Sequence, residues 1–330
     1  MTARRLVLLC GSALLALAQP AWGQPRMPSG SWRAYKLADG LPESACIEVT
    51  IAPQGKVLAR HLATESVSEL DGYGINVMPS PPTGNSRVYG SPAGQLWTVG
   101  PEGLQEFRNG GWLPHPVPEI AIAFRTGLPH LSDPIPLCPV RQGLMIVLLP
   151  DRLLQLDSED AEHLRTKVLL SAAQTGLERF TGMTQPASRE GGLWIAGTRG
   201  LIKLPGPVRS LRPDSDRQQF LIPATLAIEN LAEPRDDGDG GVTALAESSE
   251  SHQKLIVRFD GHEGWATKPI GVEKIRHGWR GPDQTWWAAT IDSFFKWEEN
   301  RPEWIESEEL AAQAGRFGWR RRRDCFATRR

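Results

Sequence analysis

The chain has 330 residues, 40% of them hydrophobic, and its 37 basic and 38 acidic side chains nearly cancel. This charge balance does not point to a nucleic acid or an acidic substrate as partner. Glycine (33 residues) and proline (27 residues) are frequent, and long runs of helix-forming residues are scarce. The composition therefore favours an all-β chain rich in turns over a helical one.

The first 23 residues have the pattern of a bacterial export signal. Arg4 and Arg5 precede an apolar run over residues 6–18, and a small-x-small sequence ends at Gly23. The run is shorter than the roughly 20 residues of a membrane-spanning helix, and no later segment is apolar enough to span. We expect cleavage after Gly23 and a periplasmic or secreted mature chain with no membrane span; an uncleaved anchor is the alternative. Three cysteines would then remain, so one disulfide at most can form.

A phrase of a glycine turn, a short apolar run, a second turn and a second apolar run recurs along the chain. The clearest copies cover residues 94–107, 191–204 and 284–297, and weaker copies cover residues 55–70, 143–156 and 240–259. Equivalent positions are 39 to 50 residues apart and fall at Leu58, Trp97, Ile146, Trp194, Ala244 and Trp287. Four short strands in a unit of this length, repeated about six times, indicate a β-propeller.

A second phrase repeats in register with the first. Gly-Leu-Pro at 40–42 and 127–129, and Gly-Leu at 176–177, come 15 or 16 residues before the turn glycine of their units. We interpret the strand after this phrase as the innermost strand of a blade, with the tryptophan strand next outward. Residues 24–305 then form an all-β propeller of six four-stranded blades, or seven if one is degenerate. Residues 31–37 are a candidate strand to pair with the last unit.

Helix is expected at two places only, residues 158–174 and 306–315, and we interpret residues 306–330 as a short helix followed by a basic tail. The tryptophans at the repeated position, Trp97, Trp194 and Trp287, should be buried between neighbouring sheets. Four others lie outside that position and could offer a sugar-stacking face instead: Trp265, Trp279, Trp297 and Trp304.

Three stretches resemble the two-component regulator propeller repeat: Asp39-Gly40-Leu41-Pro42, the following CIEVTIAPQG, and GGLWIAGTRGLIKL. The resemblance covers most of the mature chain and implies a propeller from the exported sensor region of bacterial hybrid two-component sensors, many of them associated with polysaccharide sensing. Full-length members continue through a β-sandwich, a membrane helix and a kinase, which this sequence does not show. The resemblance thus implies either a stand-alone propeller with a membrane sensor kinase as partner, or a fragment of a longer reading frame.

The motifs of cofactor, metal and catalytic sites are not found. The glycines of residues 191–200 do not lead into a helix as a phosphate-binding loop requires. Residues 236–241, DDGDGG, lack the third acid, turn glycine and closing glutamate of a calcium loop, so a solvated turn is favoured. The histidines show no zinc spacing and no G-x-S-x-G occurs. We expect a non-enzymatic protein without cofactor or metal; a propeller-fold lyase or glycoside hydrolase and an interaction scaffold are the alternatives.

Propeller geometry predicts where a ligand would bind. The loop entering the innermost strand and the loop after the tryptophan strand emerge on the same face, at the mouth of the central channel. Arginine and histidine there suit an oligosaccharide or a small anionic ligand, although ordinary solvated loop residues are the alternative interpretation. The candidate ligand-binding residues are Glu43, Ser44, Arg60, His61, His130, Arg199 and Asp292.

Overall fold

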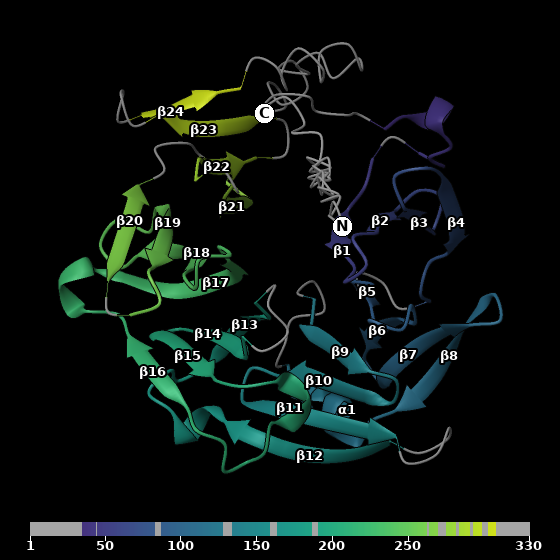
Figure 1. Ribbon diagram of the computed structural model, residues 1–330, viewed down its shortest axis with the longest axis horizontal. Helices are drawn as coiled ribbons and strands as arrows, with labels where there is room; N and C mark the ends of the chain where they lie inside the picture. Colours follow the sequence, from purple (N-terminus) through teal and green to yellow (C-terminus); the bar gives the residue numbers. More distant parts are fainter. Residues whose placement is uncertain are drawn as a thin grey trace, which may run out of the picture. The chain divides into compact units, whose positions relative to one another are not determined.

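The protein is described by a computed structural model covering residues 35–43, 45–82, 87–127, 134–158, 164–186, 191–262, 264–269, 275–281, 284–290, 293–298 and 303–307. Six four-stranded antiparallel sheets form the blades of a β-propeller (Figure 1). The strands of each blade follow one another in the chain and lie side by side in that order. The predicted six-bladed, all-β propeller is confirmed.

The first three blades run from residue 48 to residue 171. Blade 1 contains β1 (Glu48–Ile51), β2 (Val57–His61), β3 (Ser66–Leu70) and β4 (Ile75–Pro79). Blade 2 contains β5 (Tyr89–Gly90), β6 (Leu96–Gly100), β7 (Gly103–Arg108) and β8 (Gly111–Pro116). Blade 3 contains β9 (Leu137–Arg141), β10 (Leu144–Leu148), β11 (Arg152–Ser158) and β12 (Leu164–Ser171).

The last three blades run from residue 180 to residue 306. Blade 4 contains β13 (Phe180–Thr184), β14 (Leu193–Gly197), β15 (Gly200–Leu204) and β16 (Gln218–Leu221). Blade 5 contains β17 (Ile228–Asp236), β18 (Val242–Ser248), β19 (Lys254–Phe259) and β20 (Trp265–Pro269). Blade 6 contains β21 (His277–Arg280), β22 (Trp286–Ala289), β23 (Phe294–Glu298) and β24 (Glu303–Glu306).

The repeated phrase corresponds to the second and third strands of each blade. All six positions aligned on sequence lie in second strands, and the cross-strand pairs Trp194–Lys203 and Trp287–Lys296 are equivalent in blades 4 and 6. The inner strands β1, β5, β9, β13, β17 and β21 surround the centre of the ring (Figure 1). The aligned phrase therefore marked the second and third strands, and the strand after the Gly-Leu phrase is innermost, as predicted.

The hydrophobic core lies between neighbouring sheets. Trp194 is fully buried between blades 4 and 5 against Phe220 and Phe259, at ring-centroid distances of 5.7 and 6.0 Å. Burying a ring of this size contributes about 4–6 kcal/mol by area, as an upper estimate. Trp97 is buried in the same way between blades 2 and 3, as predicted.

Trp287 departs from the prediction that it is fully buried. It is only partly buried and stacks on Trp279, with ring planes 11° apart. The neighbouring Trp286 faces blade 5 instead and is buried against Leu245 and Ile256. Two consecutive tryptophans point to opposite faces of a strand, and the repeat alone does not say which one faces the core.

The helix predictions are wrong for residues 158–174. Residues 164–171 form strand β12, which pairs with β11 along its length, and only the 3-10 helix η2 (Ala172–Gln174) follows. Cross-strand pairing outweighs the helix propensity of this leucine- and lysine-containing segment. The prediction for 306–315 and the basic tail fall almost wholly outside the described residues, as do the export signal and residues 31–34.

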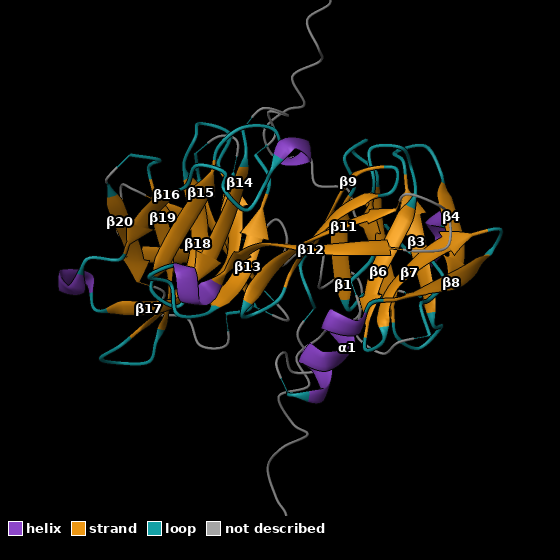
Figure 2. Ribbon diagram, turned by 90° about the horizontal axis from the view of Figure 1, so that it is seen from below, coloured by secondary structure: helices purple, strands orange, loops and turns teal. Residues whose placement is uncertain are grey.

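Helical structure is otherwise short. Helix α1 (Pro118–Arg125), which the sequence did not predict, lies beyond the strand ends on one face (Figure 2) and buries Ile120, Ala121 and Ala123. The other 3-10 helices are η1 (Leu37–Asp39), η3 (Val208–Ser210) and η4 (Ala224–Leu226). Leu37 thus begins a 3-10 turn and not a strand. No helix among the described residues has the length and apolar character to cross a membrane.

Candidate functional site

The loops that enter the inner strands and the turns after the second strands lie together, as propeller geometry predicts. In blade 1 the backbone N–H of Thr64 donates to the Glu43 carboxylate at 2.8 Å. In blade 4 the N–H of Thr198 donates to the Arg179 carbonyl at 3.0 Å, and blade 5 has the same contact between residues 249 and 227 at 2.9 Å. Helix α1 is on this face too, because Val117 N–H donates to Glu102 O beside β7.

The predicted ligand-binding residues divide into three groups. Glu43 is bonded to the turn of its own blade, and Arg199 is well exposed, with its Nη1 3.6 Å from Glu178 Oε1. Arg60 and His61 lie inside blade 1 instead of on its surface. Ser44, His130 and Asp292 lie outside the described residues.

His61 has a structural environment. Only 2% of it is exposed, its Nδ1 lies 2.9 Å from the Ala45 carbonyl, and its Nε2 lies 2.9 Å from Ser68 Oγ. Both ring nitrogens therefore have protein partners, and the ring joins the entry loop of β1 to strand β3. Arg60 is also buried, and burial lowers the pKa of its guanidinium. These two residues were expected at a ligand surface; the structure places them in the blade.

Charged residues of the inner strands form a group that the sequence analysis missed. Glu48 is the first residue of β1, Arg87 lies just before β5, Glu233 lies within β17, and His277 is the first residue of β21. We call these four residues the axial cluster, since their strands surround the centre of the ring (Figure 1). They come from blades 1, 2, 5 and 6.

The axial cluster consists of two pairs, each of a carboxylate with a basic side chain. Arg87 binds Glu48, with its Nε 2.6 Å and its Nη2 2.5 Å from Glu48 Oε1. His277 Nδ1 lies 2.8 Å from Glu233 Oε2 and 3.1 Å from Oε1. The four side chains are between 23% and 48% exposed, so each pair is partly desolvated and still accessible.

The two pairs influence each other electrostatically. Burial raises the pKa of Glu233, but the hydrogen bond and charge of His277, and then the charges of Arg235 and Arg87, outweigh it and leave the pKa lowered. Burial likewise opposes ionisation of Arg87, while Tyr89, Glu48 and Glu233 raise its pKa. Arg87 and Glu233 belong to blades 2 and 5, which are not neighbours, so this interaction acts across the centre of the ring.

Tyr89, next to Arg87, completes the wall of blade 2. Burial raises its pKa to about 12, and its hydroxyl donates to the Ile135 carbonyl at 3.0 Å. The phenol therefore stays protonated and ties blade 2 to the segment entering β9. It supports the position of Arg87 rather than supplying an ionisable group.

An irregular strand presents Glu233. Strand β17 pairs with β18 only intermittently, with register shifts on both sides of Ala232, and Asn230 and Glu233 have positive φ angles of 56° and 48°. Positive φ costs about 1–3 kcal/mol per residue and persists where the surroundings impose it. Here Pro234 lies so close to Gly182 of blade 4 that a Cβ at 182 would be 2.6 Å from its Cδ. The bulge turns the Glu233 side chain toward His277.

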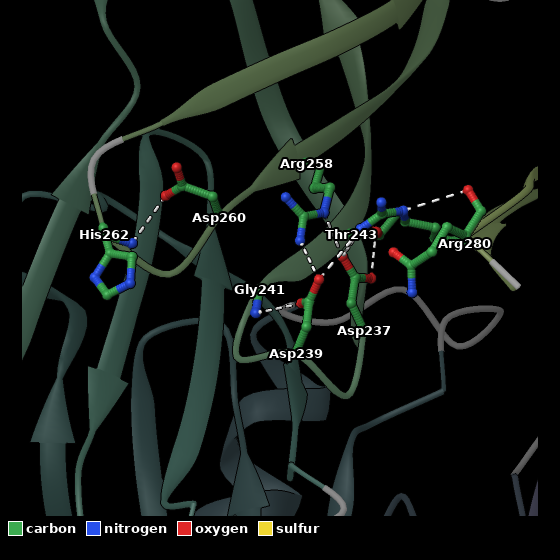
Figure 3. Close-up of polar contacts among 9 residues, drawn as sticks. Asp237, Asp239, Gly241, Thr243, Arg258, Asp260, His262 and Arg280 are labelled. Atoms are coloured by element: carbon green, nitrogen blue, oxygen red, sulfur yellow. Dashed lines mark hydrogen bonds and ion pairs between the residues drawn. The ribbon is translucent and has the colours of Figure 1, made fainter. Parts of the chain in front are cut away.

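The turn at residues 236–241 is built from ion pairs (Figure 3). Asp237 accepts a hydrogen bond from Thr243 Oγ1 at 2.5 Å and one from Arg258 Nε at 2.7 Å. Asp239 accepts from Arg258 Nη2 at 2.7 Å and from the Gly241 N–H at 3.0 Å. Arginines occupy both carboxylates, and no group of His, Cys, Asp and Glu in the described residues is arranged to hold a metal ion.

Two cysteines and one histidine–glutamate contact lie outside the axial cluster. Cys46 and Cys138 are both free thiols, and burial raises the pKa of Cys138 to about 12. His115 Nε2 lies 3.5 Å from Glu106 Oε2 in a buried setting beside Trp97.

The chain was compared with known families, curated proteins and solved structures. No family model and no curated protein matches. Among solved structures it is similar to a streptogramin B lyase (14% identity, TM-score 0.54, covering 81% of this chain and 83% of that one). It is also similar to a catalytically inactive histidine-to-alanine variant of virginiamycin B lyase from Staphylococcus aureus with quinupristin (13% identity, TM-score 0.51, covering 78% and 82%).

A third similar structure is the extracellular domain of a putative hybrid two-component system from B. thetaiotaomicron. The identity is 13% and the TM-score 0.39, and the match covers 78% of this chain and 40% of that one. At these identities the likeness to the solved structures shows the propeller fold alone.

Proposed function

We propose that the chain is an exported β-propeller that binds a small polar ligand at the axial cluster and the face where the inner strands begin. One observation carries the proposal: two pairs of a carboxylate and a basic side chain, from four different blades, lie partly desolvated and accessible around one axis. Charged groups cost free energy when desolvated, and they are retained where they serve a site. Export rests on the N-terminal pattern, and the sensor role rests on the repeat resemblance.

The charges of the cluster indicate the class of ligand. Glu48 and Glu233 supply acceptors, while the Arg87 guanidinium and the His277 ring supply donors, so the cluster offers both kinds of hydrogen-bonding group. A neutral hydroxylated molecule, which both donates and accepts hydrogen bonds, fits this set better than a simple anion does. We therefore propose an oligosaccharide-type ligand, with a membrane sensor kinase as the partner that would receive the signal.

A thermal-shift screen with neutral oligosaccharides and small carboxylates tests the proposal. A ligand at 100 times its Kd stabilises the folded state by about 2.7 kcal/mol, which raises Tm by on the order of 5 °C. The shift should disappear in Arg87→Ala and His277→Ala and persist in Arg152→Ala, a control whose ion pair with Asp151 lies in blade 3. A shift that survives both axial substitutions but is lost in Arg199→Ala would move the site to the loops.

A second candidate is an acid–base enzyme, which the His277–Glu233 contact favours. A carboxylate bonded to Nδ1 orients an imidazole so that Nε2 can exchange a proton with a substrate, the arrangement of a general base and its orienting acid. Two similar structures are lyases, which makes the streptogramin quinupristin a reasonable first substrate. Consumption of quinupristin by the wild type, followed by chromatography and abolished in His277→Ala, would support the enzyme; no consumption by the wild type removes this substrate from the candidates.

A further inference from the structure

Strand β17 and the turn that follows it contact strand β21 of the neighbouring sheet through a series of side chains. Glu233 bonds His277, and the Arg235 guanidinium lies 5.7 Å from the ring centre of Trp279. At the far end Arg280 Nη1 lies 3.3 Å from Asp239 Oδ2 and 3.9 Å from Asp237 Oδ2. The Glu233–His277 pair of the axial cluster is therefore one end of a row of contacts, and the turn that carries Asp237 and Asp239 is the other end.

Contacts within blade 5 hold Asp237 and Asp239 in place, independently of blade 6 (Figure 3). Thr243, Arg258 and the Gly241 N–H, all of blade 5, hold the two carboxylates. The Asp237 side chain is only 2% exposed. Position 241 has no space for a side chain, since a Cβ there would lie 2.8 Å from the Phe259 carbonyl oxygen. Residues of blade 5 thus hold the two carboxylates where they can bind a cation.

Arg280 is the cation that enters this receptor from blade 6. Its Nε donates to the Gln284 carbonyl at 3.4 Å, and its guanidinium lies 6.0 Å from the Trp286 ring, so it is also anchored in its own blade. Between Arg280 and His277 the strand spans about 10 Å. Gly278 lies directly against Ile256 of blade 5, where a Cβ would be 2.7 Å from its Cδ1. Fixing Arg280 therefore fixes the height of His277 along the axis.

We infer that Arg280, held by Asp237 and Asp239, is a positioning residue that sets His277 against Glu233 in the axial site. It touches neither member of that pair. Its importance for binding rests on the proposed function, but its effect on the His277–Glu233 contact does not. The contact can therefore be measured without any ligand.

The test follows the side-chain 15N signals of His277 by NMR in the folded full chain, assigned with His277→Gln. Arg280→Ala is expected to shift the Nδ1 signal toward that of a histidine without a carboxylate partner, as seen in Glu233→Gln. Arg280→Lys keeps the charge and should retain most of the wild-type signal. Arg152→Ala, which removes an ion pair of blade 3, should leave it unchanged.

A wild-type Nδ1 signal in folded Arg280→Ala would overturn the inference. If Arg280→Ala does not fold, Asp239→Asn serves in its place, since Asp239 is 42% exposed and the substitution keeps the side-chain shape. Non-additive Tm changes in a double-mutant cycle of Glu233→Gln with Arg280→Ala, or with Asp239→Asn in its place, would independently support coupling, and strict additivity would contradict it. None of these outcomes depends on whether an oligosaccharide binds, so loss of the proposed function would be recognised separately.

Discussion

At the scale of single residues, Glu233 combines an unfavourable backbone with a favourable charge. Its φ of 48° and the register shifts of β17 reduce the stability of the strand. This conformation places the carboxylate in hydrogen-bond contact with His277 and 3.5 Å from Arg235 Nη2. A residue selected only for a stable blade would not need this conformation, so the strain is consistent with a role at the axis.

The lowered pKa of Glu233 gives a pH-dependent prediction. Because the folded-state pKa lies below the unfolded value of about 4.3, the ionised carboxylate stabilises the fold above that value, and the contribution disappears as pH falls through the folded pKa. Glu233→Gln should lower the free energy of unfolding at pH 7 by about 0.5–1 kcal/mol. The difference should shrink below pH 5, measured by urea unfolding.

Glu178→Gln is the matched control for this experiment. Glu178 is also a glutamate with positive φ, but its carboxylate is 62% exposed and 3.6 Å from its nearest cation, Arg199. Its substitution should leave stability unchanged at every pH. An effect of Glu233→Gln that grows as the solution becomes acidic would contradict the assigned direction of the pKa shift.

At the scale of strands and turns, the repeated glycine before the third strand has a steric cause. Gly103 and Gly200 begin β7 and β15 with φ angles of 144° and 155°. A Cβ at Gly200 would lie against the Phe220 carbonyl of β16, closer than real Cβ atoms approach. The fourth strand pairs directly beside this glycine, with Leu221 opposite Gly200, so its backbone occupies the space that a side chain at 200 would need.

Gly200→Ala should therefore destabilise the propeller. The left-hand φ alone costs about 1 kcal/mol or more, and backbone contact adds to it, so we expect a loss of about 2–3 kcal/mol. Gly111→Ala is the control, because Gly111 has no positive φ and no atom within 4 Å of the added methyl group. Urea denaturation of both variants measures the difference; equal stability would show that the turn can relax.

Features that recur in several blades can be predicted from the sequence, and features that occur once cannot. Trp97 and Trp194, with the glycines that begin the next strands, recur because blades 2 and 4 share one tight turn and one buried second strand, so the sequence alone reveals them. The axial residues do not repeat: Arg87 precedes its strand, Glu233 sits on a bulge and His277 opens β21. They meet only when six blades close around one axis, and no spacing along the chain encodes that meeting.

His61 and Arg60 were predicted at the ligand-binding face and are buried in the sheet instead. We predicted them in the loop after the second strand, but β2 includes both residues. β2 has five residues, as do β6, β10 and β14, so the two positions are the end of a second strand and are buried in the sheet. Predicting their burial would require the register of β2 with β3, which the hydrophobic pattern does not specify.

At the scale of the whole molecule, the blades differ in how much core they share. Blades 3 and 4 are joined by fully buried side chains such as Ile146, Leu153 and Ile195. The interface of blades 5 and 6 relies on a smaller group around Ile256 and Trp286, flanked by partly buried aromatics. In blade 1, Val49 and Ile51 of β1 are 49% and 74% exposed. Among the described residues, the middle of the chain therefore has the more extensive core.

This distribution predicts that the propeller opens from its first and last blades. Local opening needs less free energy where fewer apolar side chains are buried, and a difference of about 1.4–3 kcal/mol changes exchange about 10- to 100-fold. Amides of β22 and β23 in blade 6, and of β2 and β3 in blade 1, should exchange faster with deuterium than those of β10 and β14.

Mass spectrometry of peptides after hydrogen exchange measures this order, with intrinsic rates for each sequence as the reference. Arg280→Ala should speed exchange in blade 6 further and leave blade 3 unaffected, since the ion pairs of Asp237 and Asp239 join only blades 5 and 6. Equal protection in all six blades would mean that the ring opens as one cooperative unit. In that case the axial pairs would be lost only by global unfolding, and blade 6 could not move independently during ligand binding.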